Sequence, residues 1–337
     1  MKFAMVSTHG IHKARFKLNC ETGDCTSFLS LLNLLNGFHF SFEELRKEDP
    51  SYLREFDVVM FDGHPSYIVD IISLARMLKD SNALSMFYPE GSTQLYDNSI
   101  RGFHKEYYEA WNACDILSIV EEDKVSYYKN FVSSETLVKF IHVPVTKDME
   151  SGAFLLPRHQ KKNAVLVYGD NNPNHPLIAM SCARRIGAEV IAVEIGAENI
   201  MRIKEILPGM KVYEMPKLSQ SQFLRHLAMT KVHFYQTEWI GTAREQIACA
   251  TVGTPCVGNH DSHTQRRLWP DLGCDIYDVD RMDELARKLY SDEDFYQTQV
   301  RRAFDRLSFY GEESVRRRFF EAYEQAYERK RKAKVMV

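Results

Sequence analysis

Short apolar runs recur along the chain, and amphipathic segments stand between them. In the first half, the runs of strand length are Lys2–Ser7, Asp57–Phe61, Ala83–Tyr88, Ile116–Val120 and Leu137–Val143. Apolar positions at helical spacing mark the segments Thr26–Asn36, Ser66–Leu78, Phe103–Cys114 and Lys124–Phe131. Strands that are apolar on both faces and alternate with helices are typical of parallel sheets covered on either side.

The second half repeats this alternation. Its predicted strands are Ala164–Tyr168, Val190–Glu194, Lys211–Tyr213, Val232–Tyr235, Pro255–Gly258 and Asp275–Tyr277. Its predicted helices are His175–Ile186, Ala197–Leu207, Ser219–Met229, Gly241–Thr251, Thr264–Leu268 and Met282–Ser291. Two long amphipathic helices, about Asp294–Leu307 and Glu312–Lys332, close the chain, and we expect the basic tail after Arg329 to be frayed.

A linker-like segment with charged residues, Gly and Pro, Lys147–Lys162, separates the halves. We therefore expect an α/β fold of two Rossmann-like domains, residues 1–150 and 151–310, with parallel sheets facing across a cleft. The C-terminal helices would pack back, and the helix in residues 311–337 would cross to the first domain. Ligands of such sheets bind at the carboxyl ends of the strands.

Composition narrows the class of protein. Of 337 residues, 45% are apolar and 26% charged, which supplies a core for each domain and excludes a largely disordered chain. The net charge of −3 excludes a globally basic nucleic-acid coat but leaves a local basic face open. No stretch approaches the roughly 20 apolar residues of a membrane helix. The N-terminal apolar run is too short for a signal peptide, so we expect a cytoplasmic protein.

The segment VHFYQTEWIGTAREQIACATVGTPCVGN, Val232–Asn259, places a helix before a Gly-Thr-Pro turn and an apolar strand. This order of helix, Gly-Thr-Pro turn and strand resembles that of the GT-B glycosyltransferases. The resemblance implies an enzyme of hexosyltransferase type with a nucleotide sugar, UDP-linked, as co-substrate. Glu238 stands where many members have the first acid of a Glu-x7-Glu pair. The second acid would fall at Ala248, and the nearest acid here is Glu245.

A narrower set of motifs is similar to the DNA base glucosyltransferases of T-even phages, which are also GT-B enzymes. These motifs are DVVMFDGHPS, ALSMFYPEG, Thr242-Ala243-Arg244 and the stretch His263–Arg267. The resemblance implies a hydroxymethylated base in phage DNA as acceptor, double-stranded DNA as partner and the host cytoplasm as location. It also implies a catalytic carboxylate at Glu90.

Transfer of a sugar requires neutralisation of the leaving diphosphate. A helix start with an arginine suits this role, so we expect Thr242 and Arg244 to hold phosphate and Glu245 to accept the ribose hydroxyls. The alternatives are a surface ion pair for Arg244 and a solvated first-turn glutamate. Further donor contacts are predicted at Gly169, Asn171, Asn172, His175, Lys217 and Glu238. For the loop before His175 a plain turn is the alternative, and for Lys217 an exposed lysine.

An inverting transfer also needs a base for the acceptor hydroxyl. The candidates follow predicted strands: Glu90, and the pair Asp62 and His64. A capping or loop role is the alternative for each. Arg266 and Arg267 are candidate acceptor or nucleic-acid contacts, and a solvated helix face is their alternative.

Metal binding is not indicated. The His residues near the predicted strand ends and Glu90 match no ligand spacing, although a divalent metal is not excluded. The seven cysteines are odd in number and form no Cys-x-x-Cys pair, so we expect neither a disulfide framework nor structural zinc.

Glycosyl transfer is thus the leading hypothesis. The alternatives are a transferase acting on a glycan, lipid or small molecule, a sugar-nucleotide epimerase, or a non-catalytic protein that binds a nucleotide sugar.

Overall fold

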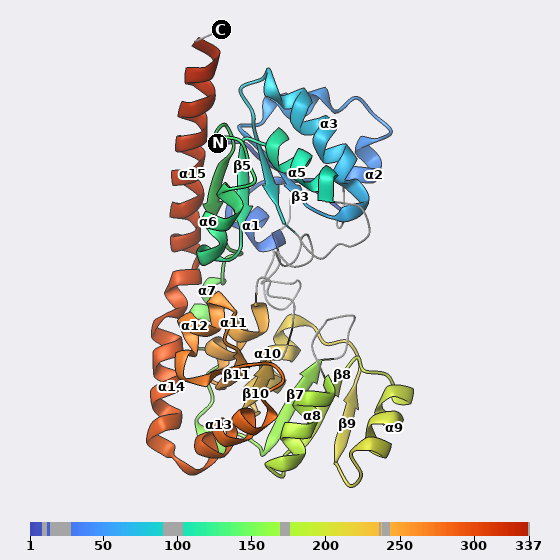
Figure 1. Cartoon of the computed structure of the whole chain (residues 1–337), viewed down its shortest axis with the longest axis vertical. Helices are drawn as coiled ribbons and strands as arrows, with labels where there is room; N and C mark the ends of the chain where they lie inside the picture. Colours follow the sequence, from blue (N-terminus) through green and yellow to red (C-terminus); the bar gives the residue numbers. More distant parts are fainter. Residues whose placement is uncertain are drawn as a thin grey trace. The chain divides into compact units, whose positions relative to one another are not determined.

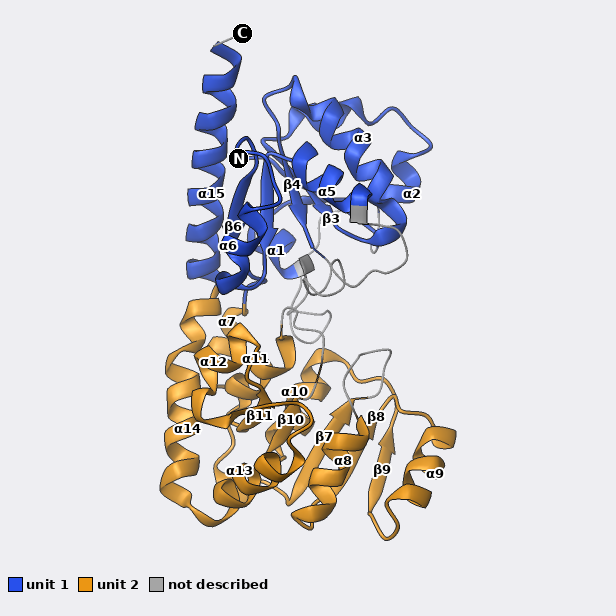
Figure 2. Cartoon of the chain, viewed as in Figure 1, with its two compact units in different colours: residues 1–18, 26–144, 312–337 blue, residues 19–25, 145–311 orange. Residues whose placement is uncertain are grey.

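The computed structural model describes residues 1–8, 12–13, 28–89, 104–168, 176–235, 237 and 243–335. The chain divides into two compact units (Figure 2). Unit 1 comprises Met1–Leu18, Thr26–Pro144 and Glu312–Val337, and unit 2 comprises Asn19–Cys25 and Val145–Gly311. Both units are built on parallel strands alternating with helices, which confirms the predicted fold class.

Unit 1 contains a six-stranded sheet of order β2-β1-β3-β4-β5-β6, in which every neighbouring pair is parallel. Its strands are β1 Phe3–Ser7, β2 Phe38–Ser41, β3 Val58–Asp62, β4 Leu84–Tyr88, β5 Ile116–Ile119 and β6 Leu137–Phe140. The chain passes from β1 to β2 on one side of β1 and then to β3 on its other side, so the direction of strand order reverses at β1. The carboxyl ends at such a switch point are where open α/β sheets bind ligands.

Helices cover both faces of this sheet (Figure 1). They are α1 Phe28–Leu34, α2 Phe42–Leu45, α3 Ile68–Lys79, α5 His104–Ala113, α6 Val125–Lys129 and α15 Glu312–Val335. Successive side chains of a strand point to opposite faces of the sheet, so alternate residues belong to two different hydrophobic cores. Ala4 and Val6 pack with α2, α3 and α5, whereas Phe3 and Met5 pack with α1 and α15.

Strand β2 is one of the elements that the sequence pattern did not predict. Its sequence FHFS has only four residues and contains His39 and Ser41, so it lacks a continuous apolar run. Pairing with β1, in which His39 lies opposite Met5, buries this polar side chain in the sheet.

Unit 2 contains two three-stranded parallel sheets, β7-β8-β9 and β10-β11-β12. The strands are β7 Ala164–Tyr168, β8 Glu189–Val193, β9 Val212–Met215, β10 His233–Tyr235, β11 Cys256–Asn259 and β12 Gly273–Cys274. A parallel bridge between Lys162 and Thr230 precedes β7 and β10, which lie side by side. The strands therefore follow the order of a doubly wound domain. The last strand lies before the predicted segment Asp275–Tyr277, which is not a strand.

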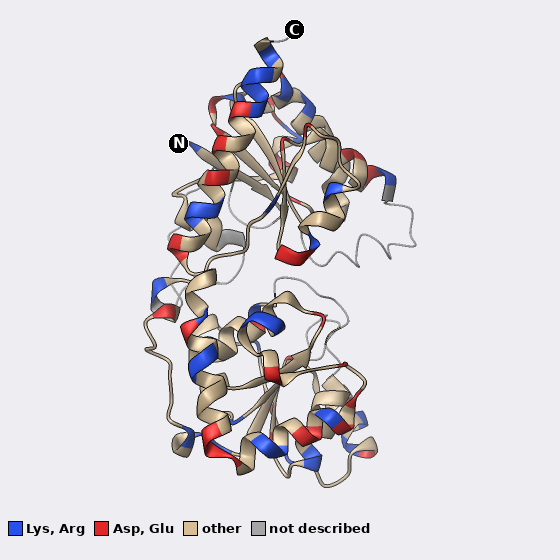
Figure 3. Ribbon diagram, turned by 60° about the vertical axis from the view of Figure 1, so that its left-hand side comes forward, with Lys and Arg blue, Asp and Glu red and all other residues tan. Residues whose placement is uncertain are grey.

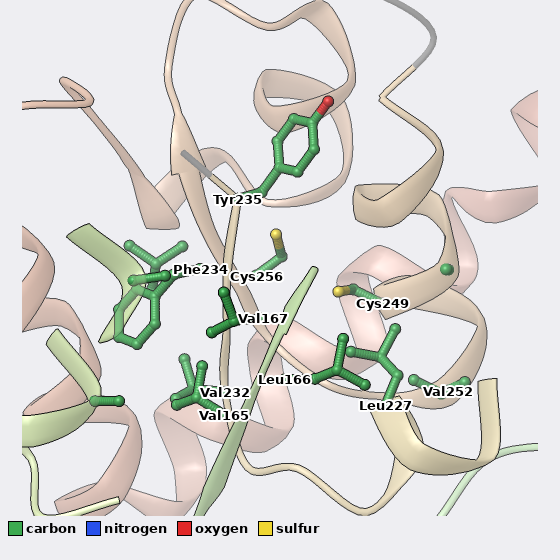
Figure 4. Packing of buried hydrophobic residues seen from close by; sticks show 14 of the residues in the cluster. Val165, Leu166, Val167, Leu227, Val232, Phe234, Tyr235, Cys249, Val252 and Cys256 are labelled. Atoms are coloured by element: carbon green, nitrogen blue, oxygen red, sulfur yellow. The ribbon is translucent and has the colours of Figure 1, made fainter. Parts of the chain in front are cut away.

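The helices of unit 2 surround these sheets. They are α7 Lys147–Glu150, α8 Pro176–Arg185, α9 Ala197–Ile206, α10 Gln220–Ala228, α11 Arg244–Val252, α12 His263–Leu268, α13 Val279–Ser291 and α14 Glu293–Asp305. Val165 of β7 lies beside Val232, the residue before β10, whereas Leu166 of β7 faces Leu227 of α10 (Figure 4). One core thus joins the two sheets.

The last helix, α15, belongs to unit 1 and remains helical to Val335, so the basic tail is not frayed in this structure. Figure 3 shows Lys and Arg residues gathering in its last turns. Lys330 points inward: Nζ donates to the carbonyls of Leu78 (3.1 Å) and Ala83 (2.6 Å) and lies 3.2 Å from Asp115 Oδ2. Its side chain is only 10% exposed, and burial lowers its pKa.

We expect Lys330→Ala to lower the free energy of unfolding by about 2 kcal/mol, because it leaves buried acceptors without their donor. The matched control is Lys332→Ala, an exposed lysine on the same helix, which should stay within about 0.5 kcal/mol of wild type. Urea unfolding followed by circular dichroism measures both. Equal effects of the two substitutions would contradict a clamping role for Lys330.

Candidate functional site

Polar side chains line the carboxyl ends of the unit 2 strands, in contrast to the apolar strand interiors. Tyr168 ends β7, and its hydroxyl donates to the carboxylate of Glu194, which follows β8. Lys217 is exposed after β9, and Thr237 follows β10. Asn259 ends β11, and its Nδ2 donates to the carbonyl of Thr237 at 3.2 Å. The hydrogen bonds join the ends of neighbouring strands at the edge where α/β sheets bind ligands.

Glu194 has a φ angle of 54°, in the left-handed region that a side chain with a Cβ seldom adopts. Strained backbone of this kind persists where the surrounding structure fixes it, and it is concentrated at functional sites. The strained backbone of Glu194 therefore points to the same edge of the sheet as the candidate site.

Helix α11 begins at Arg244, three residues after the predicted start at Gly241. The correction has a local cause: Ala243 is left-handed, with φ 47° and ψ 40°, and therefore cannot continue a right-handed helix. Arg244 is exposed in the first turn. The first amides of a helix have no acceptor within the helix, and this end carries partial positive charge, so the start of α11 is suited to bind an anion.

Glu245 is not the solvated first-turn residue of the alternative interpretation. Its Oε2 lies 3.1 Å from Nε2 of His233 on β10, and the side chains are 16% and 2% exposed. His233 was not predicted from the sequence, because a single histidine in an apolar strand gives no signal of its partner.

A buried amide network fixes α11 against the neighbouring strand and helix. Gln246 Nε2 donates to Gln265 Oε1 of α12 at 2.8 Å, and Ser262 Oγ lies 3.0 Å from Gln246 Oε1. Gln265 Nε2 in turn donates to the carbonyl of Cys256 at 2.9 Å. A Cβ at Gly258 would lie 2.6 Å from Gln265 Oε1, so only glycine leaves room for the network.

The two arginines predicted for the acceptor lie on α12. The Arg266 guanidinium donates to the carbonyls of His260 (2.8 Å) and Asp261 (2.7 Å), which supports the loop after β11. Arg267 stacks on the ring of Phe309 with its guanidinium carbon 3.6 Å from the centroid. Both cations therefore have structural contacts within unit 2.

In unit 1, Asp62 ends β3 and is only 1% exposed. The adjacent end of β1 carries Ser7, whose Oγ lies 2.8 Å from Nε2 of the buried His39 on β2. These residues occupy the switch point of the sheet. His64, in contrast, takes the capping role: its Nδ1 accepts the Ser66 amide at 3.2 Å.

Several predicted site residues lie outside the described residues, and their assignments stay predictions. They are Glu90, Gly169, Asn171, Asn172, His175, Glu238 and Thr242. Of the predicted donor contacts, the described part of the chain contains Lys217, Arg244 and Glu245. The structure places these in unit 2, and it places Asp62 and His64 in unit 1.

Within the described ranges, no group of three or more His, Cys, Asp and Glu side chains is arranged to hold a metal ion. Among the same residues, no helix has the length and apolarity needed to cross a membrane. Burial raises the pKa of the Cys249 thiol in α11, with neighbouring Cys256 as a further cause, so this thiol is not activated as a nucleophile.

No protein-family model matches the chain, and neither does any curated protein sequence. Solved structures do. The Anabaena protein HepE in complex with UDP and glucose has a TM-score of 0.69 and 9% identity, over 96% of this chain and 100% of that chain. Sucrose-phosphate synthase from Thermosynechococcus elongatus has a TM-score of 0.68 and 12% identity, over 97% and 99%.

An alpha-glucosyltransferase in complex with UDP and a 13-mer DNA containing an HMU base is also similar, with a TM-score of 0.62 and 11% identity over 97% and 99% of the two chains. These structures confirm the predicted resemblance: the chain has the fold of the GT-B glycosyltransferases.

Proposed function

We propose that the chain is a glycosyltransferase that moves a sugar from a UDP-sugar to a hydroxyl acceptor. The observation that carries the proposal is the start of α11, where Arg244 and the paired Glu245 stand at the carboxyl edge of a doubly wound unit. The fold supports it, because similar structures over nearly the whole chain include two with UDP.

In the proposed donor complex, the diphosphate lies at the start of α11. The Arg244 guanidinium and Thr242 bind its oxygens and neutralise the charge that develops on the leaving group. The loop with Gly169, Asn171, Asn172 and His175 provides further hydrogen bonds. Glu245 accepts the ribose hydroxyls, and Lys217 lies beside the nucleobase. Glu238 stays a proposed donor contact.

For an inverting reaction, we propose that a carboxylate of unit 1 removes the acceptor proton. Asp62 is buried at the switch point beside Ser7, and a carboxylate there can accept a hydroxyl proton. Glu90 is the second candidate. His64 is the least supported of the three because its Nδ1 already accepts a backbone hydrogen bond.

As acceptor we propose a hydroxymethylated base in DNA of a phage, modified in the host cytoplasm, with Arg266 and Arg267 near the nucleic acid. The similarity to a structure that contains DNA with an HMU base supports this choice. The synthases of trehalose 6-phosphate and sucrose-phosphate are similar too, so a small sugar phosphate is the second candidate.

The proposal is tested first with a panel of nucleotide sugars in thermal-shift measurements, because a ligand that binds the folded state raises the melting temperature. We expect a UDP-sugar to give the largest shift. The protein is then incubated with that donor and either hydroxymethylated duplex DNA or glucose 6-phosphate. Mass spectrometry should find a hexose added to the DNA. A stabilising donor without transfer to any acceptor would indicate a non-catalytic binding protein.

Arg244→Ala should raise the dissociation constant for the donor about tenfold or more, because a charge-assisted contact of about 1.5–3 kcal/mol is lost. Calorimetry measures the constant. Arg281→Ala, an exposed arginine of α13 paired with Glu284, is the matched control and should bind like wild type. An unchanged constant for Arg244→Ala would remove this residue from the site.

Asp62→Asn and Glu90→Gln separate the two carboxylates. The variant of the true base should bind donor with wild-type affinity and lose turnover by about 100-fold or more, whereas the other keeps most of its rate. Single-turnover rates, with donor binding measured alongside, report both quantities. Near-wild-type turnover in both variants would reject a carboxylate base at either position.

A further inference from the structure

We propose that His233 is a positioning residue for recognition of the donor ribose, acting through Glu245. This inference rests on the proposed function, in which Glu245 accepts the ribose hydroxyls. His233 itself is 1% exposed and lies within strand β10, so it does not contact a ligand directly. Its effect is on the direction in which the glutamate carboxylate points.

The pair connects a rigid strand to the first turn of α11. Nε2 of His233 lies 3.1 Å from Oε2 of Glu245, twelve residues along the chain. His233 is held opposite Cys256 in the parallel pairing of β10 with β11. The carboxylate is therefore anchored to the sheet, although the glutamate belongs to a helix start.

The surroundings leave the ring one polar contact. Among the residues that the structure describes, Nδ1 of His233 is buried and has no hydrogen-bond partner, whereas Nε2 faces Oε2 of Glu245. A carboxylate oxygen accepts hydrogen bonds, so Nε2 of His233 is the donor in this pair.

This donor bond orients Glu245 before the ligand arrives. A free glutamate side chain must lose rotamer freedom on binding, and a carboxylate fixed in advance avoids that loss. Each carboxylate oxygen accepts more than one hydrogen bond, so the bond from His233 leaves acceptor capacity for a vicinal diol. The ligand class that this arrangement selects is a ribonucleotide rather than a nucleotide without ribose hydroxyls.

The test measures binding of UDP and of 2′,3′-dideoxy-UDP to the full chain by calorimetry. His233→Asn and His233→Phe remove the Nε2 donor, whereas the amide nitrogen of His233→Gln reaches a similar position. We expect the Asn and Phe variants to bind UDP about tenfold more weakly and to bind the dideoxy nucleotide as wild type does. The Gln variant should recover most of the UDP affinity.

Thr251→Val is the matched control: Thr251 is buried in the same helix and its Oγ1 donates to Ile247, far along α11 from Glu245. It should lower stability, measured by thermal unfolding, without changing the preference for UDP. Two variants that lack the Nε2 donor, His233→Asn and His233→Phe, are included so that the comparison can be made if only one of them folds.

The outcomes separate the two hypotheses. If wild-type protein prefers UDP over the dideoxy nucleotide and the loss variants keep that preference, the role of His233 is wrong and the proposed function stands. Equal weakening for both nucleotides would also overturn it, since that pattern reports a structural effect. If wild-type protein binds neither nucleotide, the proposed function fails and this inference fails with it.

Discussion

The network of buried hydrogen bonds made by the amide side chains of Gln246 and Gln265 is the constraint on which the candidate donor site depends. Apolar packing holds α11 in unit 2 but is not directional, whereas a hydrogen bond fixes both distance and angle. In a water-excluded interior, a missing partner leaves a buried polar group with its full desolvation cost. The network therefore allows one rotation of α11 about its axis, and that rotation directs Glu245 toward His233.

The opposite end of α11 is fixed by a different device. Gly253 adopts the left-handed conformation that ends the helix, with φ 66°. The buried ammonium of Lys161 donates to the carbonyl of Val252 (3.2 Å) and to Thr254 Oγ1 (2.9 Å), and burial lowers its pKa to about 7. Because both ends of α11 are held, the helix is a rigid support for the side chains of its first turn.

Apolar runs predicted the fold well because parallel strands are buried on both faces and leave a continuous signal. Where burial involves polar side chains the signal is lost. Strand β2 was missed because His39 and Ser41 interrupt the run, and the pairing of Ser7 with His39 spans 32 positions. The start of α11 was misplaced because its position depends on the left-handed backbone of Ala243, which alanine does not favour on its own. The motif around Arg244 nevertheless led to the correct helix.

Similar structures at 9–12% identity show how little of the sequence the fold requires. A sheet with covering helices needs apolar residues of suitable size at the right period, and many sequences meet that condition. Function depends instead on polar groups whose orientation is fixed by buried partners. In this chain, polar side chains with such partners lie at strand ends and at a helix start: Tyr168 on Glu194, Ser7 on His39 beside Asp62, and Glu245 on His233. These buried pairs therefore identify the side chains on which specificity should be measured.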